Sequence, residues 1–162
     1  MLDANSRTLL DDVTQFIYRE ARLQDDHEYE AWEALWTDDG VYWIPAGGEG
    51  GDPERDMSIV YDNRSRISLR VKQLLTGRRL SQTPRSRIRR IVSNIEILDR
   101  DDRNIRVTSN AMVFELQTRG ETIWASRNEY VLRHEANGLR MAFKKVVLVN
   151  NDQPLFSMAF LI

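Results

Sequence analysis

The second half of the sequence most constrains the fold, because it consists of long β-rich segments separated by turn signals. These segments cover residues 87–98, 105–118, 121–133 and 139–150. Asn137-Gly138, between the last two, is typical of a tight β-hairpin. Apolar residues then alternate with polar or small ones, at Leu139, Met141 and Phe143 against Arg140, Ala142 and Lys144. We therefore expect an antiparallel meander over about 86–162.

The first half shows helical spacing instead. Apolar residues three and four positions apart predict an amphipathic helix over about 6–23 and a second over about 27–36. Thr37-Asp-Asp-Gly40 is expected to end the second helix, with Gly40 as a left-handed cap. A short strand over 41–44 is predicted to stop at Pro45, before a flexible loop over 45–56.

A third helix is predicted over about 63–76, after a short apolar stretch from Met57 to Tyr61 that is either extended or a lead-in to the helix. Asp62 or Asn63 can cap its start, and Gly77 suits the position just after its end. The tail 155–162, LFSMAFLI, is too apolar for a free chain end, so we expect it to add a strand or to dock on a neighbour.

Helices followed by a meander predict an α+β fold, with a curved sheet wrapped around helices in a half-open cone. The length of 162 residues suits a single domain over 1–162. Its first part, about 1–77, is expected to be mainly helical. The start of the chain lacks the pattern of a signal peptide, and no apolar run approaches the roughly 18 residues of a membrane span. We expect a cytoplasmic protein.

The residues that the chain lacks exclude several kinds of chemistry. It has no cysteine, so it can supply neither a thiolate nucleophile nor the cysteines of an iron–sulfur cluster. It has only two histidines, His27 and His134, and an iron site of two histidines and one carboxylate would need both. No glycine-rich phosphate-binding motif is present. A metal site remains an alternative only if these two histidines meet in the fold.

A basic stretch lies in the middle of the chain. Between Asn63 and Ile95 there are ten Lys or Arg residues and no Asp or Glu, whereas the whole chain has 23 basic and 25 acidic residues. This asymmetry predicts a positively charged surface and a negatively charged partner. A nucleic acid is one alternative, although no nucleic-acid-binding motif accompanies the stretch. Contact with another protein subunit is the preferred interpretation.

Four segments carry a resemblance to a known family. They are YREARLQDD (18–26), WEALWTDDGVYWIP (32–45), YDNRSRISLRVKQLLTGRRLSQTPRSRIRRIVSNIEI (61–97) and LVNNDQPLFSMAFLI (148–162). Together they resemble the small, or beta, subunit of aromatic-ring-hydroxylating (Rieske non-haem iron) dioxygenases. The resemblance implies the cone-shaped nuclear transport factor 2/cystatin-like fold, with N-terminal helices packed on a long, strongly curved, mainly antiparallel sheet.

The resemblance also implies a non-catalytic, structural role in a multicomponent enzyme. Such enzymes cis-dihydroxylate an aromatic compound with O2 and electrons derived from NAD(P)H. A large alpha subunit then carries the Rieske 2Fe–2S cluster and the mononuclear non-haem iron, and this chain carries no cofactor, no metal site and no catalytic residue. The expected partners are that alpha subunit, in an α3β3 hexamer, and further copies of this chain in a trimer, with neither nucleic acid nor membrane as a partner.

A set of residues is the hypothesis for the contacts between subunits. Arginine suits such contacts because its planar guanidinium meets a carboxylate with two hydrogen bonds. The set consists of Arg64, Arg66, Arg70, Arg78, Arg79, Arg85, Arg87, Arg89, Arg90, Phe156 and Phe160.

The main alternative is a stand-alone isomerase or dehydratase of the same cone fold. Proton transfer would then fall to Tyr18, His27, Asp38 and Asp39, and a buried carboxylate among them could have its pKa raised toward neutrality. These side chains would have to converge in one closed cavity. The aromatic residues Tyr29, Trp32 and Trp36, with Tyr42 and Trp43, are interpreted as core, with a ligand pocket as the alternative.

Overall fold

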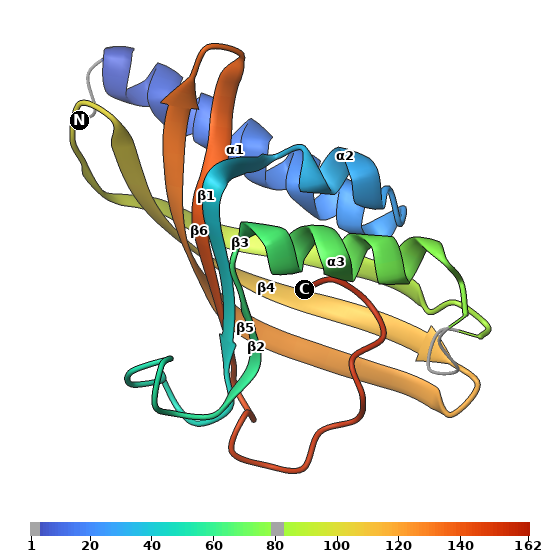
Figure 1. The fold of residues 1–162 in the computed structure, drawn as a ribbon. Helices are drawn as coiled ribbons and strands as arrows, with labels where there is room; N and C mark the ends of the chain where they lie inside the picture. The colour runs from blue at the N-terminus through green and yellow to red at the C-terminus, as the bar shows by residue number, and fades with distance from the viewer. Residues whose placement is uncertain (1–3, 79–82) are drawn as a thin grey trace.

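Two helices begin the computed structural model, which describes residues 4–78 and 83–162 (Figure 1). Helix α1 spans Ala4–Asp25 and buries Val13, Phe16 and Ile17 on one face. The predicted amphipathic helix is thus confirmed. Helix α2 spans only Tyr29–Glu33, much less than the predicted 27–36.

The shortness of α2 corrects the expected role of the segment 37–40. Strand β1 spans Trp36–Pro45 and includes this segment, because Trp36 and Thr37 are buried in extended conformation. Gly40 is not a helix cap. A Cβ atom at this position would lie 2.8 Å from the Trp36 ring, so the ring itself requires glycine here.

Strand β2 and helix α3 follow the loop after β1 and agree with the prediction. Strand β2 spans Ser58–Asp62 and pairs antiparallel with β1. Helix α3 spans Arg64–Leu75, and the Asn63 side chain accepts a hydrogen bond from the backbone N–H of Arg66 at 3.0 Å. Gly77 has φ +63°, as expected for the residue after a helix end.

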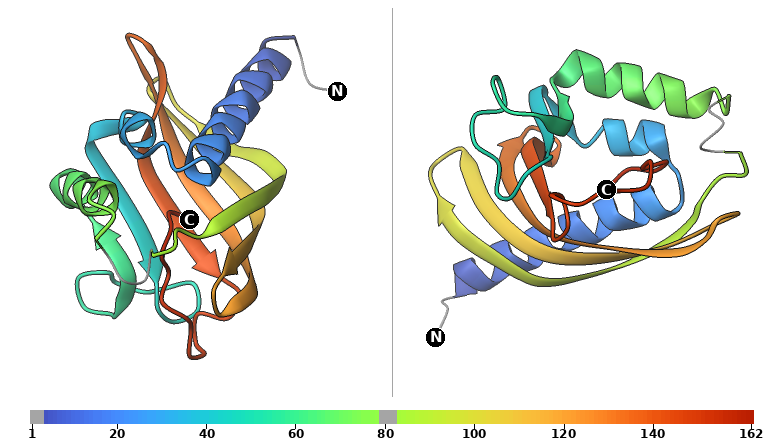
Figure 2. Two further views of the ribbon diagram at one scale, coloured as in Figure 1. Left: turned by 90° about the vertical axis from the view of Figure 1, so that its right-hand side faces the viewer. Right: turned by 90° about the horizontal axis from the view of Figure 1, so that it is seen from below.

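Four long strands complete the sheet: β3 Arg87–Arg100, β4 Asn104–Gln117, β5 Gly120–Glu135 and β6 Gly138–Leu148. The strand order is β2-β1-β6-β5-β4-β3. Of the strands in the described ranges, only β1 and β6 pair in parallel, and the other neighbours are antiparallel. The sheet curves around the helices on its concave side (Figure 2). The predicted α+β fold, with helices on a mainly antiparallel curved sheet, is confirmed. Among the described residues, no helix is both long and apolar enough to span a membrane.

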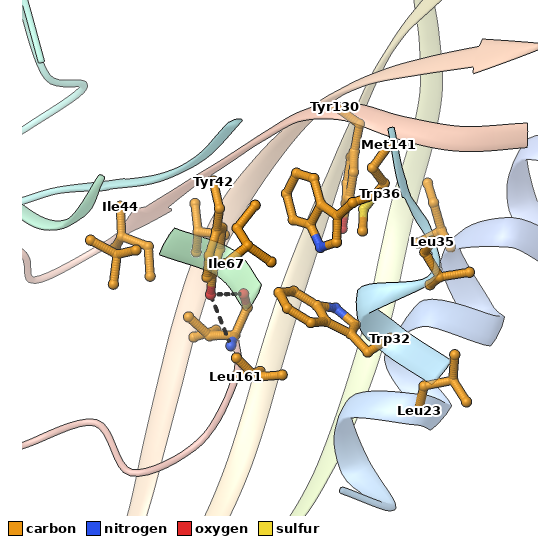
Figure 3. Close-up of a cluster of buried hydrophobic side chains, with 14 of the residues drawn as sticks. Leu23, Trp32, Leu35, Trp36, Tyr42, Ile44, Ile67, Tyr130, Met141 and Leu161 are labelled. Atoms are coloured by element: carbon orange, nitrogen blue, oxygen red, sulfur yellow. Dashed lines mark hydrogen bonds between the residues drawn. The ribbon is translucent and has the colours of Figure 1, made fainter. Parts of the chain in front are cut away.

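The core on the concave side contains Trp32, Trp36 and Tyr42 (Figure 3), whereas Trp43 lies outside this cluster, with the Lys145 Nζ 4.8 Å from its ring centre. Trp32 meets Trp36 edge-on at 5.5 Å between ring centroids and meets Tyr42 at 5.7 Å. All three rings are buried, so their interpretation as core is confirmed. Tyr29 is also buried, at the start of α2.

The C-terminal tail, residues 149–162, forms no strand and returns to the concave side of its own sheet (Figure 1). Phe160, Leu161 and Ile162 are buried there. The Tyr42 hydroxyl donates to the Ile162 carbonyl and accepts from the Ile162 N–H, as the dashed lines in Figure 3 mark. The expectation that the tail adds a strand or docks on a neighbour was wrong, because these side chains fill the cone of their own chain.

Candidate subunit interface

An exposed apolar patch lies on the convex face of the sheet, which the helices leave uncovered. Alternate residues of β3, β4 and β5 point to this face, while their neighbours Ile88, Val113 and Trp124 point into the core. The outer patch consists of Ile91 (60% exposed), Met112 (42%), Phe114 (43%), Leu116 (37%) and Ile123 (55%). A solvated sheet face ordinarily carries polar residues, so a cluster of this kind marks a surface for a partner.

The strand register places the outer patch in adjacent rows. Phe114 pairs with Arg89 on one side and Ile123 on the other, and Leu116 lies between Arg87 and Glu121. These residues surround a surface hollow of about 590 Å³. The patch therefore has two arginines at its β3 border and a glutamate at its β5 border.

The basic stretch does not form one surface, because several of its charges are neutralised within the chain. Arg64 pairs with Glu33 at 2.8 Å, and Arg70 pairs with Asp62 at 2.6 Å. Arg90 is buried and pairs with Asp25. Half-buried pairs of this kind position side chains inside the fold and leave little charge for a nucleic acid.

The remaining arginines of the predicted set are exposed, apart from Arg79, which lies outside the described residues. Arg78, Arg87 and Arg89 are exposed on the loop after α3 and on β3, and Arg85 is exposed with its guanidinium 5.6 Å from the centre of the Tyr29 ring. Arg66 is exposed and donates to the Tyr61 carbonyl at 3.3 Å. Their role in subunit contacts stays a prediction.

Arg90 is the residue of that set whose surroundings differ most from the expectation. Its side chain is 4% exposed, and Nε donates to Asp25 at 2.7 Å. Its Nη1 and Nη2 donate to the Gln24 side chain at 2.7 Å and the Leu161 carbonyl at 2.9 Å. Arg90 therefore ties the end of α1 and the tail to β3, and its side chain has no exposed surface to offer a partner.

The two phenylalanines of the set have opposite surroundings. Phe156 is 61% exposed and lies under the Arg119 guanidinium, 4.5 Å from its ring centre. Phe160 is 5% exposed and meets the Trp124 ring edge-on at 5.7 Å. Of the two, only Phe156 is exposed enough to contact another subunit, because Phe160 is buried within its own chain.

The four residues of the isomerase or dehydratase alternative do not converge. Tyr18 is 48% exposed on α1, and Asp38 and Asp39 are exposed on β1. Hydrogen bonds from the Thr37 hydroxyl and the Arg133 guanidinium lower the pKa of Asp39. A general base at neutral pH needs the opposite shift, so the arrangement does not favour this alternative.

His27 and His134 have different neighbours. His27 lies between α1 and α2 with φ +56°, and its Nε2 lies 2.8 Å from the Ser86 carbonyl while Nδ1 lies 3.0 Å from the Tyr29 hydroxyl. A neutral ring with the proton on Nε2 satisfies both contacts. His134 is exposed near the end of β5. Within residues 4–78 and 83–162, no three His, Cys, Asp or Glu side chains form a group that could hold a metal.

Stability should fall on acidification because of His27. Burial is the largest effect and lowers the pKa of His27 below its ordinary value of 6.5, although the hydrogen bond with Ser86 and the charge of Asp25 oppose it, whereas Arg85 and Arg90 act with burial. Between the folded pKa and 6.5 the unfolded chain binds a proton that the folded chain does not, so stability rises with pH in this window. The effect is at most about 1.4 kcal/mol for each unit of lowering.

The variant His27→Asn tests this, because asparagine tolerates a positive φ. Its free energy of unfolding, measured from pH 5 to 8 with urea, is expected to depend less steeply on pH than that of the unaltered protein. His134→Asn is the matched control and should keep the original dependence. Equal slopes in His27→Asn and the unaltered protein would contradict the assignment.

A buried ion pair lies at the centre of the cone, and the sequence did not point to it. The Lys144 Nζ donates to the Glu20 carboxylate at 2.6 Å, and the two side chains are 1% and 2% exposed. Trp32 Nε1 and the Tyr130 hydroxyl both donate to the same carboxylate at 3.2 Å. Burial lowers the pKa of Lys144, and the charge of Glu20 opposes this effect. The centre of the cone is therefore occupied by packed and paired groups.

An irregularity in β6 explains why Lys144 is buried. Val131 pairs with Phe143 but Leu132 pairs with Met141, so Ala142 is an extra residue in β6. This bulge turns Phe143 away from the core and Lys144 into it. The simple alternation expected over 139–144 was therefore wrong beyond Met141.

Comparisons with known proteins agree in sequence and in structure. A family model described as "Ring hydroxylating beta subunit" matches residues 19–153. The small subunit of 2-halobenzoate 1,2-dioxygenase from Burkholderia cepacia is 31% identical over 145 residues, which cover 86% of this chain and 88% of that protein.

Two solved structures share the fold. The beta subunit of benzoate 1,2-dioxygenase from Burkholderia mallei is 25% identical, covers 99% of both chains and has a TM-score of 0.77. An NTF2-like protein with a cystatin-like fold from Novosphingobium aromaticivorans is 16% identical, with a TM-score of 0.62 over 91% of this chain and 88% of that chain. The expected cone fold is thus confirmed.

Proposed function

The chain belongs to the family of ring-hydroxylating beta subunits, as its four recognised segments predicted, and on that premise we propose that it acts as a structural subunit of an aromatic-ring dioxygenase. The complete enzyme would cis-dihydroxylate an aromatic compound with O2 and electrons from NAD(P)H. Relatives of this chain belong to dioxygenases that act on 2-halobenzoate, benzoate and anthranilate. An aromatic acid is therefore the substrate class that these relatives favour.

The observation that carries the proposal is the contrast between the two faces of the sheet. The concave side packs the chain's own core and tail, with one cavity beside the tail, whereas the convex side presents the outer patch without a partner among the described residues. A chain without cysteine cannot supply the two cysteines that a Rieske cluster needs. The Rieske cluster and the catalytic iron therefore belong to the alpha subunit, with which the beta subunits of these dioxygenases pair.

A second copy of this chain is the proposed occupant of the outer patch. The patch has a basic border at Arg87 and Arg89 and an acidic border at Glu121. The basic border of one copy can therefore face the acidic border of the next. A head-to-tail contact of this kind gives a ring when its rotation closes after a whole number of copies. Three copies in a ring, each bound to one alpha subunit, would give an α3β3 complex in the cytoplasm.

The variant Phe114→Glu is expected to prevent self-association of the chain. Its charge would be buried without a partner in the contact between copies, whereas the folded single chain would keep it in water. Mass by light scattering at low and high salt is the measurement, and the unaltered chain should be a trimer. Leu69→Glu, at a 54% exposed leucine on α3, is the matched control and should remain trimeric.

The trimer interface and the structural role are tested separately. A trimeric Phe114→Glu variant would remove the outer patch from the interface. Co-purification with the alpha subunit, with native mass and iron content of the complex, tests the structural role separately. A stable monomer that turns over an aromatic compound by itself would contradict that role.

A further inference from the structure

A cavity of about 360 Å³ lies beside the tail, between it and strands β1, β2 and β5. Its apolar wall includes Trp124, Phe156 and Phe160, and Arg70 and Tyr42 reach it from α3 and β1. The volume is within the range of small-molecule sites, which combine apolar walls with a few polar groups. None of these residues belongs to the outer patch.

Each ring of the aromatic wall has a side-chain contact that positions it. Trp124 donates its indole N–H to the Glu115 carboxylate at 2.8 Å, and Phe160 meets its ring at an interplanar angle of 74°. Phe156 is held under the Arg119 guanidinium. Aromatic rings prefer offset or edge-on contacts with one another, so a flat aromatic body suits this wall better than a branched aliphatic one.

Arg70 supplies the polar end of the cavity. Its Nε donates to the Asp62 carboxylate at 2.6 Å, and its side chain is 27% exposed. Among the described residues, that carboxylate is the only hydrogen-bond partner of its guanidinium, so the Nη1 and Nη2 donors are available. Two parallel N–H donors match the two oxygens of a carboxylate. The Tyr42 hydroxyl already donates to the Ile162 carbonyl, so the Tyr42 side chain only lines the cavity.

We propose that this cavity binds a small aromatic carboxylate, with its ring against Trp124 and Phe160 and its carboxylate on the Nη donors of Arg70. The net charge of the Arg70–Asp62 pair is zero, so the affinity rests on the two hydrogen bonds and on burial of the ring, and is modest. Because the tail forms one wall, a bound ligand also holds the tail in place. The site goes beyond the structural role and does not depend on it.

The test uses the full chain with benzoate as the probe. The protein has four tryptophans, so a spectrum of ¹⁵N-labelled indole groups has four signals, and Trp124→Phe identifies the one from Trp124. Benzoate is expected to shift the Trp124 signal in a saturable way and to leave those of Trp32 and Trp36 in place. Hydrogen exchange at residues 159–162 should slow when benzoate is present.

Ligand and protein controls separate this site from unspecific binding. Benzyl alcohol keeps the ring and acetate keeps the carboxylate, and each should bind about tenfold or more weakly than benzoate. Arg70→Lys keeps the charge opposite Asp62 but loses the paired donors, and should weaken benzoate by a similar factor. Arg66→Lys, at an exposed arginine of the same helix, should not.

Two results would overturn the proposal. One is a Trp124 signal that does not move with benzoate. The other is equal binding of benzoate and benzyl alcohol in the unaltered chain, which does not depend on any variant folding. Neither result affects the proposed structural role, which is measured by mass and co-purification.

Discussion

Replacing Lys144 by methionine is expected to destabilise the protein by about 3–5 kcal/mol, because it leaves the Glu20 carboxylate buried without its countercharge. Methionine has nearly the length of lysine, so the loss reports the charge rather than a cavity. Trp32 and Tyr130 would still donate to the carboxylate, but neither carries a charge. Urea unfolding followed by circular dichroism measures the change.

Two control variants isolate the ion pair. The double variant Glu20→Leu with Lys144→Met removes both charges and should recover much of the lost stability, since apolar replacement of a whole buried pair is often neutral. Lys145→Met, at the next position of β6, should have a small effect because that side chain points to the convex side. If Lys144→Met were as stable as Lys145→Met, the pair would not matter to the fold.

Replacing Arg90 by leucine is expected to cost a similar amount, about 3–5 kcal/mol, and to loosen the tail. Among the described residues, the change leaves the Asp25 carboxylate, 5% exposed, with only the backbone N–H of residue 90 as a donor. The Leu161 carbonyl also loses its donor. Urea unfolding gives the stability, and hydrogen exchange at residues 159–162 reports the tail.

Arg100→Leu is the matched control, because its side chain is exposed on the same strand and lies outside the outer patch. It should change stability by less than about 0.5 kcal/mol, as surface substitutions usually do. Arg90→Lys should lie between the two, since lysine keeps the charge but cannot reach three acceptors at once. Unchanged exchange of the tail in Arg90→Leu would contradict its role as the anchor.

Helices and strands with strong periodicity could be predicted from the sequence because their pattern is local. The spacing in α1, the Asn63 cap of α3 and the turn at Asn137-Gly138 each depend on neighbouring residues only. The prediction for segment 36–40 failed because its structure depends on residues that are distant in sequence. Its helix-ending residues are drawn into β1 by the burial of Trp36, which depends on strand β6 alongside.

The candidate site was predicted less well than the fold. Charge density indicated a surface of arginines, but the fold uses Arg64, Arg70 and Arg90 internally, next to acids distant in sequence. The outer patch was missed because residues 111–114 of β4 are all apolar, so no polar alternation marks the exposed face there. Met112, Phe114 and Leu116 alternate with buried residues, and this pattern was visible in the sequence.

The sequence by itself determined the type of most elements, the absence of any cysteine chemistry and the membership in a family of structural subunits. These depend on local spacing, composition and motif order. Only the tertiary structure decided which charges are paired inside and which apolar residues remain outside. The bulge at Ala142 shows the physical reason: one extra residue in β6 turns Lys144 toward Glu20, 124 positions away, and no local pattern records such a contact.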